Sequence, residues 1–226
     1  MDTTLEPTRR HRRAQRRDGL STRAVVLEAA GKVFAERGFA EATSKEICER
    51  AGTNGAAVNY YFGGKESLYE EVLVEAHGQM LNLDDLNEIM ASSASPEKKL
   101  RAFLERMINT AFSASELWGI KIFVREVSSP SPFISKALTN AVLPKADVLR
   151  SLLHEITGLP PDSNRLQRAT AFVIIPCISL IMFPSRLRAK VLPATTADPQ
   201  AMLDDLMTYA LGGLKALGAS GDSVKE

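Results

Sequence analysis

Apolar side chains recur every three to four residues along most of this chain, which is the period of an amphipathic α-helix. The first run, from Val26 to Phe34, ends at Arg37 and Gly38, where a glycine can take the positive φ of a helix C-terminus. No segment shows the strict alternation of apolar and polar residues that a half-buried strand requires. The pattern therefore predicts an all-α protein of about nine helices.

Residues that can cap a helix mark where each helix of the N-terminal third begins. They are Ser21 or Thr22, then Thr43, then Thr53 or Asn54. Thr43 is followed three residues later by Glu46, which is the spacing of a capping box. After the second short helix the pair Gly63-Gly64 interrupts the helical pattern, and a longer helix begins near Lys65.

Five further helices are predicted from the apolar period in the rest of the chain. They cover residues 97–113, 118–127, 133–157, 165–183 and 202–217. Pro144 is expected to bend or interrupt the third of them, because a proline inside a helix removes a hydrogen bond. Residues 91–96, 128–132 and 158–164 are expected to be loops, and 184–199, with three prolines, a connection.

The most apolar run is 171–183, which has 13 residues and contains Pro176. A bilayer-spanning helix needs about 20 apolar residues, so this run is interpreted as a buried helix and no membrane partner is expected. The arginine-rich N-terminus has no apolar stretch behind it, so a signal peptide is not expected. A cytoplasmic protein is the resulting prediction.

Positive charge is concentrated at the N-terminal end. The whole chain has a net charge of +1, whereas residues 1–23 hold seven arginines against three acids, which leaves +4 there and about −3 elsewhere. Residues 1–20 lack an apolar period and are expected to form a disordered arm, and residues 219–226 a flexible tail. The arm either keeps the tail soluble or contacts phosphate and the minor groove of DNA.

The remaining composition favours a folded protein without a catalytic centre. Hydrophobic residues make up 45% of the chain and charged residues 24%, which is ordinary for a globular protein. The two cysteines, Cys48 and Cys177, are expected to be reduced thiols rather than a zinc site or a disulfide. The three histidines do not cluster with carboxylates, and no catalytic motif is present, so no enzyme, metal or cofactor is predicted.

The segment 43–65, TSKEICERAGTNGAAVNYYFGGK, predicts two short helices joined by a tight turn at Ala51-Gly52. Small and polar residues face outward on the second of these helices, whereas Val58 and Phe62 point into a core together with Phe34 and Ile47. This is the pattern of a helix-turn-helix, whose second helix enters the major groove of DNA.

Residues 22–73 resemble the TetR/AcrR family of one-component bacterial transcriptional regulators. The resemblance lies in AVVLEAAGKVFAERGF and in AGTNGAAVNYYFGGKESLY, which is similar to the family pattern AGVSxGTLYxHFxxKexL. VNYYFGGKESLY and the later FVREVSSPSPF resemble a subgroup with a CerR-type C-terminal domain. The chain departs from the pattern at Asn59, where a tyrosine is common, and at Ala56, where a glycine is common.

The resemblance implies a domain organisation and a set of partners. A three-helix DNA-binding unit at 21–66 precedes a larger helical domain at 67–218, which binds a small ligand and forms a homodimer through its last two helices. The implied partners are a double-stranded DNA operator and an unidentified small-molecule effector, which we expect to be hydrophobic.

Ten residues are candidates for DNA contact. They are Thr43, Ser44, Lys45, Asn54, Gly55, Ala56, Ala57, Asn59, Tyr60 and Lys65. Asn59 can pair bidentately with adenine, and the small residues before it permit close approach to the groove. Lys65 is a cation at a helix N-terminus, which is unfavourable unless it meets a phosphate. Thr43, Ser44 and Asn54 also serve as caps, and Tyr61 has an equal claim to packing between helices.

The candidates for ligand contact are less specific, because large apolar side chains also fill a core. They are Phe103, Met107, Trp118, Phe123, Arg125 and Phe172, with Glu126, His154 and Ser179 as further polar groups. The sequence as a whole predicts a ligand-responsive, nucleoid-associated repressor. A transcriptional activator, a non-allosteric architectural protein and an enzyme with an accessory DNA module are the alternatives.

Overall fold

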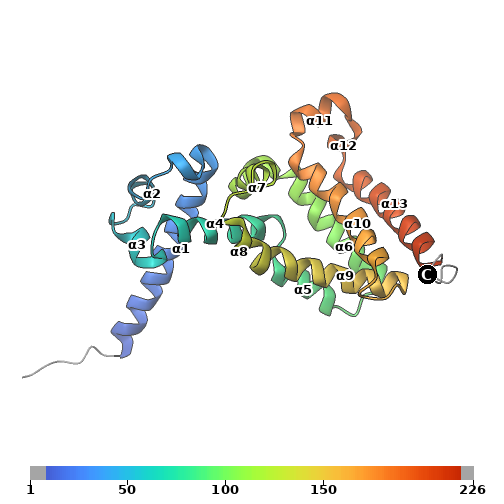
Figure 1. The fold of residues 1–226 in the computed structure, drawn as a ribbon, viewed down its shortest axis with the longest axis horizontal. Coiled ribbons are helices and arrows are strands. Elements are labelled where there is room, and N and C mark those ends of the chain that lie inside the picture. The colour runs from blue at the N-terminus through green and yellow to red at the C-terminus, as the bar shows by residue number, and fades with distance from the viewer. Residues whose placement is uncertain (1–8, 220–226) are drawn as a thin grey trace, which may run out of the picture. The chain divides into compact units, whose positions relative to one another are not determined.

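The computed structural model describes residues 9–219, with side chains described from residue 21, and the described chain contains helices and no strands (Figure 1). The all-α prediction is therefore confirmed. Two compact units divide between Leu73 and Val74, inside one helix, rather than at the expected boundary of 66 and 67. Residues 220–226 of the expected tail at 219–226, and the first eight residues of the arm, lie outside the described residues.

The N-terminal unit consists of α1 (Arg9–Glu41), α2 (Ser44–Arg50), α3 (Ala57–Phe62) and the first part of α4 (Lys65–Met80). Helix α1 begins at Arg9, so the expected start at Ser21 and the disorder expected for 9–20 are wrong. Six of the twelve residues at 9–20 are arginine, which favours helix even without an apolar stripe. Gly38 has a φ of 78° and kinks the helix where an end was predicted.

A small core holds this unit together. Phe34, Ile47 and Val58 are fully buried and Phe62 nearly so, as predicted. The Phe34 ring packs edge-on against Tyr69 at 4.8 Å between centroids. These contacts bring α1, α2, α3 and α4 into one body, so each short helix is stabilised by packing rather than by its own length.

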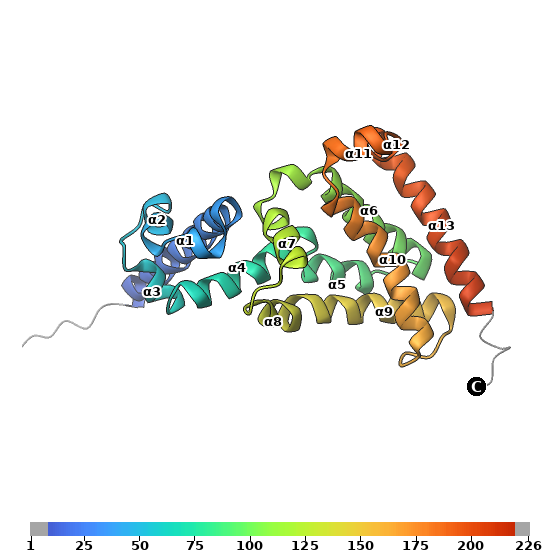
Figure 2. The same cartoon turned by 45° about the horizontal axis from the view of Figure 1, so that its top comes forward.

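Nine α-helices follow α4. They are α5 (Leu83–Ala91), α6 (Pro96–Phe112), α7 (Trp118–Ser128), α8 (Ile134–Ala137), α9 (Leu143–Thr157), α10 (Asn164–Met182), α11 (Ser185–Val191), α12 (Ala194–Ala197) and α13 (Pro199–Ala219). A short 3₁₀ turn, η1 (Ala114–Glu116), and a π-helix, η2 (Leu138–Val142), lie between them. Helices α6, α9, α10 and α13 pack side by side around one large core (Figures 1 and 2).

The described chain has eleven α-helices of six residues or more, whereas about nine helices were predicted. The two additional helices are α5 and α11. Helix α5 was missed because it is short, although Asn82 caps it and Leu86 is fully buried. Helix α11 lies in the predicted connection, between Pro184 and Pro193, where prolines allow only two turns. Pro144 does interrupt the predicted helix at 133–157, since η2 ends just before it.

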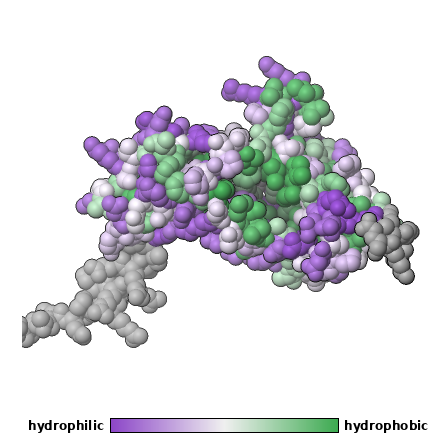
Figure 3. All heavy atoms as spheres, in the orientation of Figure 1, coloured by the Kyte–Doolittle hydropathy of each residue, from purple (hydrophilic) through white to green (hydrophobic). Residues whose placement is uncertain are grey.

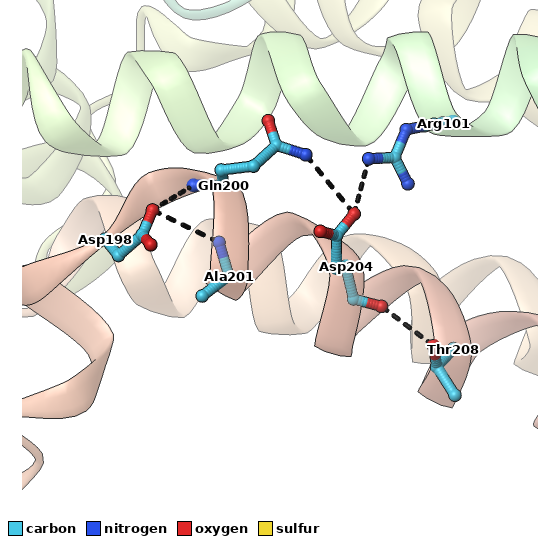
Figure 4. Close-up of polar contacts among 6 residues, drawn as sticks. All are labelled: Arg101, Asp198, Gln200, Ala201, Asp204 and Thr208. Atoms are coloured by element: carbon cyan, nitrogen blue, oxygen red, sulfur yellow. Dashed lines mark hydrogen bonds and ion pairs between the residues drawn. The ribbon is translucent and has the colours of Figure 1, made fainter.

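A polar contact on the surface ties α13 to α6. Asp204 accepts hydrogen bonds from Arg101 of α6 and from Gln200, and the Arg101 guanidinium holds the pKa of this carboxyl below its usual range (Figure 4). The start of α13 is capped by Asp198, which accepts from the backbone N–H groups of Gln200 and Ala201 at 2.8 and 3.2 Å. The last helix is thus fixed in register on α6.

Helix α10 is less covered than its composition suggested. Val173 and Cys177 are buried, but Phe172 is 59% exposed and Ile175 58% exposed, so the interpretation of 171–183 as a buried helix is wrong for one face. By length and composition alone, α10 is the one helix of the described chain that would suffice to cross a membrane, which is weak evidence because core helices share these properties. One apolar face of α10 therefore lacks cover within this chain.

Candidate nucleic-acid interface

Helix α2 begins with the predicted cap. Thr43 has extended backbone angles, and its Oγ1 accepts a hydrogen bond from Glu46 N at 3.1 Å. The Glu46 carboxylate accepts from Arg37 Nε at 2.7 Å, which fastens α2 to α1. Lys45 is exposed, and its Nζ is 3.9 Å from Glu49 one turn later. Thr43 is thus a cap at the molecular surface, Ser44 is half-buried beside it, and Lys45 projects into solvent.

The turn between α2 and α3 is built by Gly52 and Asn54. Gly52 has a φ of 63°, a backbone conformation that residues with a Cβ rarely adopt. Asn54 Oδ1 accepts from Ala56 N, and the Asn54 carbonyl accepts from Ala57 N, both at 2.9 Å. Thr53 instead donates back to the carbonyl of Cys48 in α2. The N-cap of α3 is Ala56, without a side-chain cap hydrogen bond, so the cap predicted at Thr53 or Asn54 is wrong, and Asn54 instead stabilises the turn that leads into the helix.

The outer face of α3 presents Asn59 and Tyr60 to solvent, and Tyr60 is 81% exposed. Gly55 and Ala56 are also exposed in the turn before the helix. Ala57 is only 7% exposed, so its placement on the outer face was wrong: it lies on the side of the helix that packs inward with Val58. The Tyr61 ring is half-buried and meets the Tyr60 ring edge-on at 4.8 Å.

Lys65 is engaged within the unit. Its Nζ donates to the carbonyls of Phe39 and Ala42 at 3.0 Å each and lies 4.4 Å from the centroid of the Phe39 ring. These acceptors lie at the C-terminal end of α1, where carbonyls attract a cation. The unfavourable position of this lysine at a helix N-terminus is thus compensated inside the protein, and contact of Lys65 with phosphate stays a prediction.

Two arginines position the helices in a way that the sequence did not reveal. Arg23, which contributes to the positive charge of residues 1–23, pairs with Glu71 of α4 and lies over the Phe62 ring at 4.7 Å. Arg50 of α2 donates to Glu36 of α1 at 2.8 Å, and this hydrogen bond raises the pKa of Arg50. These charges therefore fasten α2, α3 and α4 to α1, and among the described residues none of these ion pairs involves Asn59 or Tyr60.

The six candidates for ligand contact lie on three helices of the C-terminal unit. Phe103 and Met107 of α6 belong to the buried core, which matches their packing interpretation. Trp118 is buried and Phe123 half-buried on α7, whereas Arg125 is exposed. Phe172 lies on the uncovered face of α10. His154 and Ser179 bond locally to backbone carbonyls, and the buried Lys145 was missed because a lysine in a helix suggests a surface.

Comparison with protein families covers both units. Residues 26–72 match the family described as bacterial regulatory proteins, tetR family. Residues 96–214, more than half of the chain, match the C-terminal domain of the HTH-type transcriptional dual regulator CecR.

The chain belongs to the TetR family of bacterial transcriptional regulators. Its C-terminal domain, expected to be of a CerR type, is the domain that the family description names CecR. Members of this family are DNA-binding regulators, so the recognition made from the helix-turn-helix segment is confirmed.

Individual relatives agree with this assignment. The chain is 22% identical over 137 residues to the probable regulator YttP of Bacillus subtilis, covering 60% of this chain and 65% of YttP. It is 35% identical over 89 residues to the repressor NicS of Pseudomonas putida, covering 39% and 40%. The chain thus spans less than two thirds of the length of these relatives.

A solved structure shows the same fold along most of the chain. The regulator FadR of Bacillus subtilis, in complex with stearoyl-CoA, matches with a TM-score of 0.64 at 16% identity, covering 84% of this chain and 98% of FadR. At this identity the likeness concerns the fold alone.

Proposed function

We propose that this protein is a ligand-responsive repressor that binds a specific operator and is released from it by a small molecule. The observation that carries the proposal is the outer face of α3, where Asn59 and Tyr60 project from a helix with small residues before it. Asparagine can bond bidentately to adenine, and an aromatic hydroxyl can reach a phosphate. Repression rather than activation is supported by the relative NicS, which is named a transcriptional repressor.

The protein acts as a homodimer through α10 and α13. Phe172 and Ile175 of α10 are uncovered, and the neighbouring α13 exposes Tyr209, which is 73% exposed, and two glycines, Gly212 and Gly213. A Cβ built on either glycine meets no atom within 4 Å, so a second helix can approach closely there. An apolar face beside small residues suits an isologous interface with a second copy. Two recognition helices then enter successive major grooves of a pseudo-palindromic operator.

The effector binds in the C-terminal unit and favours a conformer that does not fit the operator. Support comes from the fold, since FadR, which shares it, was solved with stearoyl-CoA. A ligand shifts the equilibrium between the two conformers only to the extent that it binds one of them more tightly than the other. A cytoplasmic location, in contact with the nucleoid, follows from this role.

The test is fluorescence-anisotropy binding of the purified protein to its own upstream intergenic DNA, over a salt series and with a panel of hydrophobic compounds. We expect sequence-selective binding that weakens steeply with salt, because lysine and arginine release counterions from phosphate, and that one compound abolishes. Equal binding to all DNA, indifferent to every compound, would leave a non-specific architectural protein instead.

A second experiment distinguishes repression from activation, because the family description of the C-terminal domain names a dual regulator. A promoter fused to a reporter, with and without the protein, separates the two roles. We expect lower expression when the protein is present. Higher expression would make this protein an activator while leaving operator binding intact.

A further inference from the structure

A lysine and a histidine meet inside the C-terminal unit. Lys145 of α9 is 7% exposed, and its Nζ lies 2.9 Å from Nδ1 and 3.3 Å from the carbonyl oxygen of His77 in α4. Burial lowers the pKa of Lys145 to about 8. Burial, with a contribution from the nearby Lys145, lowers the pKa of His77 to about 4. At neutral pH the lysine is therefore mainly a cation and the imidazole is neutral.

This buried cation has no counterion in the described part of the chain. Its two acceptors, the imidazole and a backbone carbonyl, are both uncharged, and no carboxylate contributes to its pKa. Charges in protein interiors are normally paired, because an isolated charge loses its hydration. An ammonium also has three N–H donors, of which these acceptors use two. The position therefore lacks one negative charge and one acceptor.

The imidazole supplies a second donor beside the ammonium. An ammonium cannot accept, so His77 Nδ1 is the acceptor and the neutral ring carries its proton on Nε2. Nε2 has no hydrogen-bond partner among the described residues, and His77 is only half-buried. The ring meets Phe123 of α7 edge-on, with 6.0 Å between centroids. Two unused donors thus adjoin an aromatic side chain.

The elements around this pair are fixed by close contacts. Gly119 of α7 donates its N–H to Gln79 Oε1 at 3.0 Å, and a Cβ at Gly119 would lie 2.8 Å from Ala76 Cα. Only glycine therefore lets α7 dock on α4 and bring Phe123 to His77. On the other side, the π-helix η2 directly precedes α9, and such segments are frequent at functional sites. Figure 3 shows apolar side chains gathered around a hollow in the middle of this unit.

We propose that Lys145 and His77 form the headgroup site of an amphiphilic effector that carries one carboxylate and an apolar body. One buried positive charge matches a monoanion, and a carboxylate can accept the remaining N–H of Lys145 Nζ while His77 Nδ1 and its carbonyl oxygen hold the ammonium in place. Phe123, which lies against the His77 ring, contacts the apolar body of the ligand. The inference rests on the proposed function for the existence of an effector. It adds a route of action, since His77 lies on α4, the helix that both units share.

The test compares probes of equal chain length on the full-length protein: decanoate, 1-decanol and decyltrimethylammonium. Binding is followed by the fluorescence of Trp118, the only tryptophan, which lies on the same helix as Phe123. We expect the wild type to bind decanoate at least about tenfold more tightly than decanol, and the cation most weakly, because an ion pair in a desolvated site contributes more than one at the surface.

Two variants separate the site from general surface charge. Lys145→Met removes the cation and keeps the side-chain length, so the preference for decanoate should disappear while decanol binding stays unchanged. Lys121→Met, at an exposed lysine of α7, is the matched control and should keep the preference. Equal binding of decanoate and decanol by the wild type, or an undiminished preference in Lys145→Met, would overturn the proposal.

A measurement on the wild type keeps the test valid if Lys145→Met does not fold. As pH rises above the pKa of Lys145, about 8, the free protein loses the cation, so decanoate affinity should fall about tenfold per pH unit while decanol affinity stays constant. A pH-independent preference would refute the site. Release of the protein from its operator is assayed separately. Binding of decanoate without release supports the carboxylate site and refutes its role as an effector site. Release by neutral compounds alone supports a ligand-responsive regulator and refutes the carboxylate site.

Discussion

The two units of this protein treat polar groups in opposite ways. In the N-terminal unit the charged side chains lie at the surface, where Arg37, Arg50 and Arg23 pair with acids and fasten the helices to one another. In the C-terminal unit four polar or charged side chains of the described chain are buried: Thr110, Glu126, Lys145 and Arg188. A DNA-binding surface can be predicted from the residue types of a sequence motif, whereas a buried charge can be identified only in the folded structure.

The cores differ in size as well, and this difference predicts the largest effect. Phe34→Ala and Phe103→Ala each delete a side chain that is no more than 1% exposed, which costs about 3–5 kcal/mol of stability. We expect Phe34→Ala to abolish operator binding, because the small unit has few other core residues, while the C-terminal unit keeps its helices. Phe103→Ala should lower the melting temperature with operator binding retained. Circular dichroism melts and anisotropy check both. Similar behaviour of the two variants would show that the units fold as one.

The next effect tests the uncovered face of α10. Ile175→Glu places a carboxylate on a surface that the proposed dimer buries, and an unpaired buried charge costs about 3–5 kcal/mol. We expect a monomer at micromolar concentration by sedimentation, and weaker operator binding. Glu105→Ala, on the exposed side of α6, should remain dimeric. A dimeric Ile175→Glu would place the interface elsewhere.

A substitution on the recognition helix should leave the fold unchanged. Asn59→Ala removes an exposed amide, so the melting temperature should stay the same. Operator affinity should fall about 5- to 150-fold, which corresponds to about 1–3 kcal/mol for one bidentate base contact, and discrimination at one base pair should relax. Anisotropy with single-base operator variants measures both. A uniform loss on all sequences would instead assign Asn59 to the phosphate backbone.

Deleting residues 1–20 tests whether the arginine-rich segment binds DNA. Each phosphate that a lysine or arginine neutralises contributes about 0.9 to the slope of log affinity against log salt. We expect weaker operator binding and a shallower slope, with a decrease of about one for every phosphate that the segment neutralises. The same slope in the truncated protein would mean that the segment only keeps the protein soluble.

The last prediction concerns the buried charge of the C-terminal unit. Lys145 has a folded-state pKa of about 8 against an ordinary value of 10.5, so between these values the unfolded chain binds more protons. Its destabilising contribution is complete below pH 8 and is lost as pH rises to 10.5, while His77 stays neutral throughout. Stability of the wild type relative to Lys145→Met should therefore rise over this window in urea denaturation. A constant difference would contradict the burial of the cation.

Much of the N-terminal unit could be predicted from local rules. Thr43 caps α2 through its own hydroxyl, Gly38 takes a positive φ, and Phe34, Ile47 and Val58 are buried at the positions that the helical period indicates. These features depend on residues close in sequence, where propensity, capping and periodicity act directly. The same rules failed at Ala57, because a small apolar residue suits either face of a helix.

What the sequence by itself determined is the helical class, the helix-turn-helix and the family, since all three follow from short-range patterns. The tertiary structure decided which groups the long charged side chains contact. Lys65 turned inward to the carbonyls of Phe39 and Ala42, and Arg23 turned to Glu71. Lys145 met His77, which is 68 residues away in the chain. A lysine or arginine can reach several partners, and only the packing of distant helices selects one of them.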